Sequence, residues 1–317
     1  MLKAIVITGV LAGAIFGGGK LYLHARVAHA VDQVIASQSS AAEISYSGVT
    51  SSLTGEVGIE NLHIKPHGVA DSVKIDSVTV QFPGLGYVAQ LEDNFKSKNY
   101  PESLFLSVDN MSLSTSGALI RTFEEAAAAQ MVTSDGNSGC VSPSSGTASQ
   151  LRELGYDRLA IDYTAGYQHD STTGELSLSG QIKQHSAMDV HYEVVVPMTS
   201  LSDAGAAVFM ADPALVRGSF SIQDDGYYDR LVAHCSKIEG ADPATITKDL
   251  LSVWTEQMSA MGIPPDQQML SDYHQFLTSG DSFTMKAIPR EPVRFQYLSL
   301  YEPKDIPNLL NIATAAH

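Results

Sequence analysis

The chain has 317 residues, of which 44% are hydrophobic and 17% charged, so its composition is that of a globular protein long enough to bury a substantial core. Its formal net charge is -16, because 35 acidic residues outnumber 19 basic ones. The average surface therefore repels phosphate backbones, which argues against nucleic acid as a partner.

The N-terminus carries an apolar segment. An uncharged stretch from Ala4 to Gly19 is followed by Lys20 and then by Leu21-Tyr22-Leu23. A membrane span needs about 20 apolar residues, and this run reaches that length if Lys20 extends its ammonium group outward. Residues 1–30 are therefore predicted to be a membrane anchor, which places the chain at the bacterial inner membrane as a single-pass protein with its bulk in the periplasm. The alternative is a signal peptide cleaved after Ala30.

Three glycines recur at a four-residue spacing within this segment: Gly9, Gly13 and Gly17. Small residues at this spacing let membrane helices approach closely. They are candidate helix-packing residues for a membrane-protein partner.

Residues 31–131 are predicted to be rich in strands. β-branched residues dominate from Ile44 to Ile64 and from Val73 to Phe82, and a further strand is expected from Leu104 to Ser114. The apolar alternation slips by one residue inside the first two segments, which a β-bulge would correct. We therefore expect strongly twisted sheets. The alanines and glutamates from Ala118 to Met131 favour a short helix.

A flexible Ser/Gly loop is predicted over residues 132–150, because this segment has few residues that could bury apolar surface. It contains Cys140, and the only other cysteine is Cys235. In an oxidising compartment this pair can form one disulfide, whereas in the cytosol two such thiols would be ordinary buried residues.

Residues 151–317 are predicted to hold an antiparallel meander, a helical segment and closing strands. Apolar and polar residues alternate in three successive segments, and Val216 to Ile222 looks like a fourth strand of the same sheet. The period then changes to that of a helix. The expected helices are Tyr227–Ile238, Pro243–Met261 and Pro264–Leu277, and the expected final strands are Ser282–Ile288 and Val293–Leu300, with a short polar tail after them. The predicted fold class is α+β and β-rich, with twisted antiparallel sheets, bulges, an inserted three-helix segment and one N-terminal transmembrane helix.

No catalytic residue, cofactor or metal site is predicted. The serine-hydrolase motif GxSxG is absent, and no cysteine or histidine cluster has metal-ligand spacing. Asp224 and Asp225 precede tyrosines and could bind a cation or act as acid and base. Aspartates in front of a helix also cap its free N–H groups, and we favour that structural interpretation.

The order of features resembles a known family. Ile44-Ser45-Tyr46-Ser47-Gly48-Val49, Ser52-Leu53-Thr54-Gly55-Glu56-Val57, Ile59-Glu60-Asn61-Leu62-His63-Ile64 and Val73-Lys74-Ile75-Asp76-Ser77-Val78 are similar to the start of AsmA-like and YdgA-like (domain of unknown function 945) bacterial envelope proteins. The resemblance covers about the first hundred residues. It implies an inner-membrane-anchored periplasmic protein of envelope biogenesis or lipid handling. The chain is too short to bridge the periplasm, and the family offers no catalytic residues to carry over.

The sequence therefore predicts a non-enzymatic accessory protein whose apolar sheet face could accept a lipid acyl chain. One alternative is a structural or assembly subunit of a membrane protein complex. Another is a hydrolase whose catalytic carboxylates converge only in three dimensions.

Overall fold

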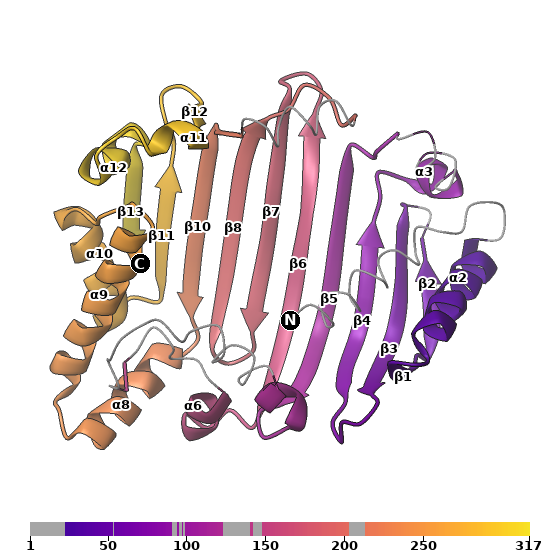
Figure 1. Cartoon of the computed structure of the whole chain (residues 1–317), viewed down its shortest axis with the longest axis horizontal. Helices are drawn as coiled ribbons and strands as arrows, with labels where there is room; N and C mark the ends of the chain where they lie inside the picture. The colour runs from indigo at the N-terminus through magenta and orange to yellow at the C-terminus, as the bar shows by residue number, and fades with distance from the viewer. Residues whose placement is uncertain are drawn as a thin grey trace.

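The computed structural model describes residues 23–52, 54–90, 94, 97, 99–122, 140–141, 148–202 and 213–317. Its main feature is one large antiparallel sheet, in which the strands follow the spatial order β1-β3-β4-β5-β6-β7-β8-β10-β11-β13 and β2 also pairs with β3 (Figure 1). The strands are β1 (Ala42–Ser45), β2 (Gly48–Ser51), β3 (Glu56–Pro66), β4 (Val73–Gln81), β5 (Ser103–Ser114), β6 (Arg158–Asp170), β7 (Glu175–Gln184), β8 (Met188–Pro197), β10 (Arg217–Asp224), β11 (Ser282–Ala287) and β13 (Ile312–Ala316).

A second, two-stranded sheet pairs β9 (Ala214–Leu215) with β12 (Val293–Arg294). The principal helices are α2 (Leu23–Gln38), α8 (Tyr227–Glu239), α9 (Pro243–Ala260) and α10 (Gln267–Ser279). Shorter ones are α3 (Leu85–Ala89), α6 (Ala148–Glu153), α11 (Phe295–Leu298), the 3-10 turn η1 (Pro303–Asp305) and α12 (Ile306–Leu309).

The strands before and after the Ser/Gly segment belong to the same sheet. β5 pairs with β6 over most of its length, from Ser103 opposite Gln168 to Ser114 opposite Arg158. The sequence suggested several sheets, because a pattern of alternation does not say which strand lies beside which. Here the strands of the main sheet that follow one another in the chain lie side by side, apart from the β1–β2 pair that shares β3.

The predicted irregularity in the early strands is present. Asn61 in β3 and Asn110 in β5 both adopt left-handed backbone conformations, with φ of 51° and 48°. Residues on both sides of Asn61, such as Ile59 and Leu62, are buried although they have opposite parity. In β5 the register against β6 shifts between Val108 and Met111. These asparagines switch the apolar residues back to one face, as a bulge does.

The first hydrophobic core lies at the N-terminal end of the sheet, where α2 packs on β1 and β2. It is built from aliphatic side chains, and Val31 of α2 and Ile59 of β3 are fully buried in it. Burial of this apolar stripe explains why residues that looked like a continuation of a membrane segment form an ordinary amphipathic helix.

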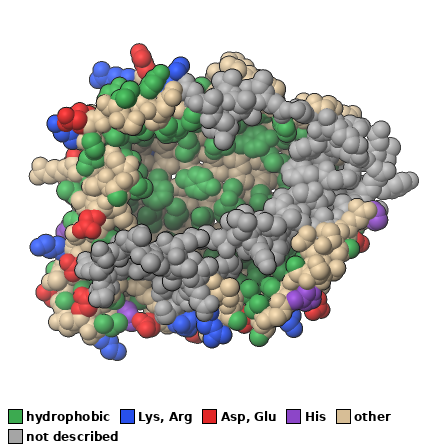
Figure 2. Space-filling model, viewed as in Figure 1, with side chains coloured by type: hydrophobic (Ala, Val, Ile, Leu, Met, Phe, Trp, Pro, Cys, Tyr) green, Lys and Arg blue, Asp and Glu red, His purple; other side chains and the backbone are tan. Residues whose placement is uncertain are grey.

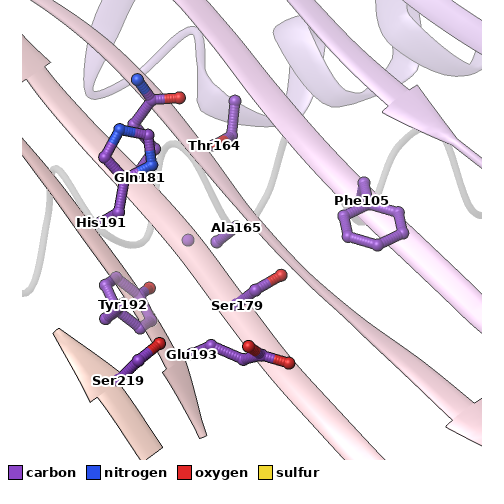
Figure 3. A pocket seen from close by; sticks show the side chains of 10 residues that line it. Phe105, Thr164, Ala165, Ser179, Gln181, His191, Tyr192, Glu193 and Ser219 are labelled. Atoms are coloured by element: carbon purple, nitrogen blue, oxygen red, sulfur yellow. The ribbon is translucent and has the colours of Figure 1, made fainter. Parts of the chain in front are cut away.

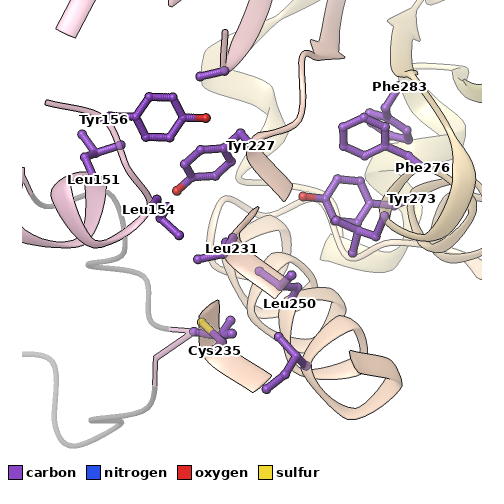
Figure 4. Close-up of a cluster of buried hydrophobic side chains, with 14 residues drawn as sticks. Leu151, Leu154, Tyr156, Tyr227, Leu231, Cys235, Leu250, Tyr273, Phe276 and Phe283 are labelled. Carbon is purple, nitrogen blue, oxygen red and sulfur yellow. The ribbon is translucent and has the colours of Figure 1, made fainter. Parts of the chain in front are cut away.

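The second core lies at the C-terminal end, where α8, α9 and α10 pack beside β11 and β13. It is aromatic, as Figure 4 shows for Tyr273, Phe276 and Phe283. The ring of Tyr273 stacks on Trp254 at a centroid distance of 4.2 Å, and Phe283 meets the Tyr273 ring edge-on at 5.2 Å. Asp242 and Asp266 cap α9 and α10 by accepting hydrogen bonds from the N–H groups of Thr245 and Met269, both at 2.9 Å. The change of period after β10 therefore marks this three-helix segment.

Cys140 and Cys235 form a disulfide, with their Cα atoms 5.4 Å apart across a sequence separation of 95 residues. The predicted pairing is confirmed. The bond ties the segment before α6 to the middle of α8, where Cys235 is completely buried in the second core.

The predicted transmembrane helix and single-pass location require correction. Among the described residues, no helix has both the length and the apolar character needed to cross a membrane. α2 has only 16 residues and uses its apolar stripe to cover the sheet. Residues 1–22, which include the apolar run and the glycines Gly9, Gly13 and Gly17, lie outside the described residues.

The end of the chain also differs from expectation. Val293–Leu300 was predicted as a strand, but only Val293 and Arg294 are extended, and Phe295–Leu298 forms the short helix α11. The last strand of the sheet is instead β13, in the predicted polar tail. Its Ala- and Thr-rich sequence has little apolar alternation, and pairing with β11 and packing against α10 stabilise it. Most of the predicted 132–150 loop lies outside the described residues.

Candidate functional site: an open apolar trough

The middle of the sheet has one continuous apolar face. The register places Tyr163 of β6, Ile182 of β7, Val190 of β8 and Ile222 of β10 in one row across four strands. The neighbouring row contains Gly180, Tyr192 and Phe220. Because alternate residues of a strand point to the same side, these side chains share the face on which the helices lie.

Neither helical core covers the centre of this face. Tyr163 lies at the border of the first core and Ile222 at the border of the second. Between them, Ile182 is 42% exposed, and Val190, Tyr192 and Phe220 are only partly buried. We define these four residues as the trough. Figure 2 shows this face hollowed, with hydrophobic side chains on its floor.

The floor of the trough is shaped by a glycine. A Cβ atom at position 180 would overlap the hydroxyl and ring of Tyr192 on the next strand. Gly180 therefore lets the Tyr192 ring lie flat across β7, an aromatic-over-glycine pairing between neighbouring strands. A larger residue at this position would push the ring up into the trough.

The two tyrosines are the polar groups of this region. Burial raises the pKa of the Tyr163 phenol, and a nearby Tyr192, which also shares a hydrogen bond with it, raises the pKa further. The Tyr163 phenol therefore remains neutral at physiological pH and can donate or accept hydrogen bonds. A mostly apolar surface with a few polar groups that fix orientation is the usual character of a ligand site.

A second pocket of about 450 Å³ is lined mainly by side chains on the opposite face of the same strands, and Gly180 and Tyr192 also belong to its lining. Its side chains are mainly polar, as Figure 3 shows for Ser179, Gln181, His191 and Glu193, with Phe105 at one side. Among its described lining residues Glu193 is the only carboxylate. Glycoside hydrolysis commonly uses a pair of carboxylates, so this pocket gives no support to the hydrolase hypothesis.

Asp224, one of the two aspartates singled out in the sequence, has a structural role. The side chain of Asp224 accepts hydrogen bonds from the backbone N–H groups of Gly226 (3.2 Å), Tyr227 (3.0 Å) and Tyr228 (3.3 Å) at the start of α8. The capping interpretation is therefore confirmed for Asp224. Burial raises the pKa of this carboxyl group, although the same three hydrogen bonds oppose the shift.

The disulfide lies at the second core and away from the trough, so Cys140 and Cys235 are structural. Within the part of the chain that the structure describes, no three histidine, cysteine, aspartate or glutamate side chains are grouped to hold a metal ion.

Sequence analysis found the apolar face that contains the trough but did not single out its residues. The alternation shows which residues share a face and gives no information on which of them a helix covers.

A family model described as "Uncharacterized protein" matches residues 171–317, which include β7, β8, the three helices of the second core and the C-terminal strands. The match therefore contains the trough residues Ile182, Val190, Tyr192 and Phe220. A search of curated proteins finds no match.

Proposed function

We propose that the protein is a non-enzymatic lipid-handling protein that holds an acyl chain in the trough. The observation that carries the proposal is the partial exposure of four large apolar side chains, led by Ile182, in the middle of a sheet whose two ends are covered by helices. Apolar surface left in contact with water is unfavourable by about 25 cal/mol per Å². A bound acyl chain would remove that penalty.

The chemistry of the trough agrees with such a ligand. Ile182, Val190 and Phe220 offer only dispersion and hydrophobic contact, which suits a methylene chain and gives no specificity for its length. The phenols of Tyr163 and Tyr192 could hydrogen-bond a carboxylate or ester oxygen at one end of the chain. Lipid handling is also what the resemblance of residues 44–78 to AsmA-like proteins implies.

Native mass spectrometry of the full chain purified from cells tests the proposal first. We expect a population with an added mass equal to that of a lipid, which organic extraction would release. A bare chain in every preparation, together with no binding of an added fluorescent long-chain fatty acid, would contradict it.

A matched pair of variants locates the binding. Ile182→Arg places a charge in the centre of the trough and should weaken fatty-acid binding about tenfold or more, because the guanidinium must lose water or exclude the ligand. Gln168→Arg makes the same charge change at an exposed position on the opposite face of β6 and should leave binding unchanged. Equal weakening by both variants would rule out the trough as the site.

A further inference from the structure

Most of the exposed large apolar side chains in the described chain belong to its C-terminal part and lie outside the trough. Of the eight large hydrophobic residues that are exposed in the described chain, six lie between residues 261 and 301. Leu300 is the most exposed, at 77%, and Met261 follows at 67%. We define the tip as these six residues: Met261, Ile288, Phe295, Tyr297, Leu300 and Tyr301. Single exposed apolar residues are ordinary, but a cluster marks an interaction surface.

The tip has a fixed apolar base. Met261 and Tyr301 line a pocket of about 420 Å³ together with Leu298, and the pocket floor is formed by Ile306 and Leu310. Ile306 and Leu310 are buried in a small hydrophobic core of their own. α11, which carries Leu298, and α12, which carries Ile306, lie together at one end of the strands (Figure 1).

The charge of this region is opposite to that of the whole protein. From Lys286 to Lys304 the chain has four basic and two acidic residues, whereas the complete chain has a net charge of -16. Arg290 and Arg294 are exposed, and the guanidinium of Arg294 lies 5.8 Å from the centre of the Tyr297 ring. Aromatic rings and aliphatic side chains beside arginines match the boundary between lipid acyl chains and anionic head groups.

We propose that the tip docks on the surface of a bilayer that contains anionic phospholipid. Leu300 and Met261 enter the boundary between head groups and acyl chains, and Arg290 and Arg294 contact lipid phosphates. This inference goes beyond ligand binding in the trough and does not depend on it.

The position of the tip relates it to the trough. The core beneath the pocket includes Val194 at its edge. Val194 belongs to β8 and lies on the same face as the trough residues Val190 and Tyr192. Docking would therefore bring the β8 end of the apolar face toward the membrane, where an acyl chain could pass to the trough.

A dye placed at the tip tests the proposal in the full chain. Both native cysteines are in the disulfide, so Leu300→Cys introduces the only reactive thiol for an environment-sensitive fluorophore. The matched control is Ile238→Cys, because Ile238 on α8 is also apolar and 59% exposed but lies outside the tip. A dye at a single position reports only on contact between that position and the vesicle.

With vesicles of phosphatidylglycerol and phosphatidylcholine, we expect a several-fold brighter, blue-shifted dye at position 300 and no change at position 238. Reversing charge with Arg290→Glu and Arg294→Glu together should raise the lipid concentration for half-maximal signal about tenfold or more. Ile182→Arg should leave the signal unchanged, which separates failure of the trough from failure of the tip. The proposal would be overturned if the dye at position 300 gave no response, or if the dye at position 238 gave an equal one. It would also be overturned if the signal rose with protein concentration in the absence of vesicles, because that would indicate contact with a second copy of the chain.

Discussion

The two helical cores cover opposite ends of one sheet in different ways. At the N-terminal end a single helix, α2, packs on aliphatic side chains such as Val31 and Ile59. At the C-terminal end three helices enclose an aromatic cluster around Phe283 and Tyr273, and a disulfide attaches α8 to the segment before α6. Among the described residues, Ile182, Val190, Tyr192 and Phe220 in the middle of the sheet belong to neither of these two cores. Each end of the sheet therefore has a core of its own, and neither of these two cores buries Ile182 in the middle.

The largest expected effect comes from breaking the aromatic core. Phe283→Ala removes a ring that contacts Trp254, Tyr273 and Phe276 and should lower the free energy of unfolding by about 3–5 kcal/mol. If the cores open separately, amide hydrogen exchange should accelerate in α8–α10 and hardly change in β3 and β4. Equal acceleration in both regions would show that the shared sheet makes them one cooperative unit.

The disulfide should contribute only to the C-terminal core. Replacing both Cys140 and Cys235 by alanine releases a bond across a separation of 95 residues and should cost about 2–4 kcal/mol. Denaturant titration of the double variant measures the loss. Reduction of the wild-type protein is the matched comparison, since it breaks the same bond without changing the side-chain volume. No loss in either experiment would show that packing alone holds α8 against the sheet.

A smaller effect is expected at the N-terminus of α10. Asp266→Ala removes the carboxylate that accepts from the Met269 N–H and should cost about 1 kcal/mol. Asp266→Asn keeps an acceptor oxygen and should recover most of this loss, as thermal or denaturant unfolding would show. An asparagine variant as unstable as the alanine variant would mean that the charge, and not the hydrogen bond, stabilises the helix.

The smallest effect concerns pH and Asp224. Its carboxyl pKa is raised in the folded protein from the ordinary value of 3.8, chiefly by burial. The folded state therefore holds this proton more tightly than the unfolded state, so the contribution of Asp224 to stability is greatest below pH 3.8 and decreases as the pH rises through the folded-state pKa. Asp224→Asn keeps an acceptor oxygen for the α8 cap and has no such dependence. Relative to wild type, the variant should become more stable as pH rises through this window, and the opposite slope would contradict the shift.

Much of the sheet could be predicted from the sequence because the alternation of apolar residues follows directly from strand geometry. The slips of parity near Asn61 marked real irregularities, and the glycines and prolines between helices marked the three-helix segment. The strand β13 could not be predicted, because Ala313, Thr314 and Ala315 form a strand only where β11 offers hydrogen bonds. The trough and the tip were missed for a related reason: exposure depends on how many helices cover the sheet, and that is decided by tertiary packing.

The disulfide also has a mechanical consequence. Residues 140–235 form a covalent loop that contains β6, β7, β8 and β10, the strands that carry Ile182, Val190, Tyr192 and Phe220. If the two termini were pulled apart, tension would pass through the sulfur atoms and bypass these strands. The end-to-end length of the fully stretched chain would be roughly 330 Å shorter with the disulfide than without it, because the residues of the loop would not extend by their usual length of about 3.5 Å each. The floor of the trough is thus the part of the sheet that stretching the chain cannot unravel until the bond is reduced.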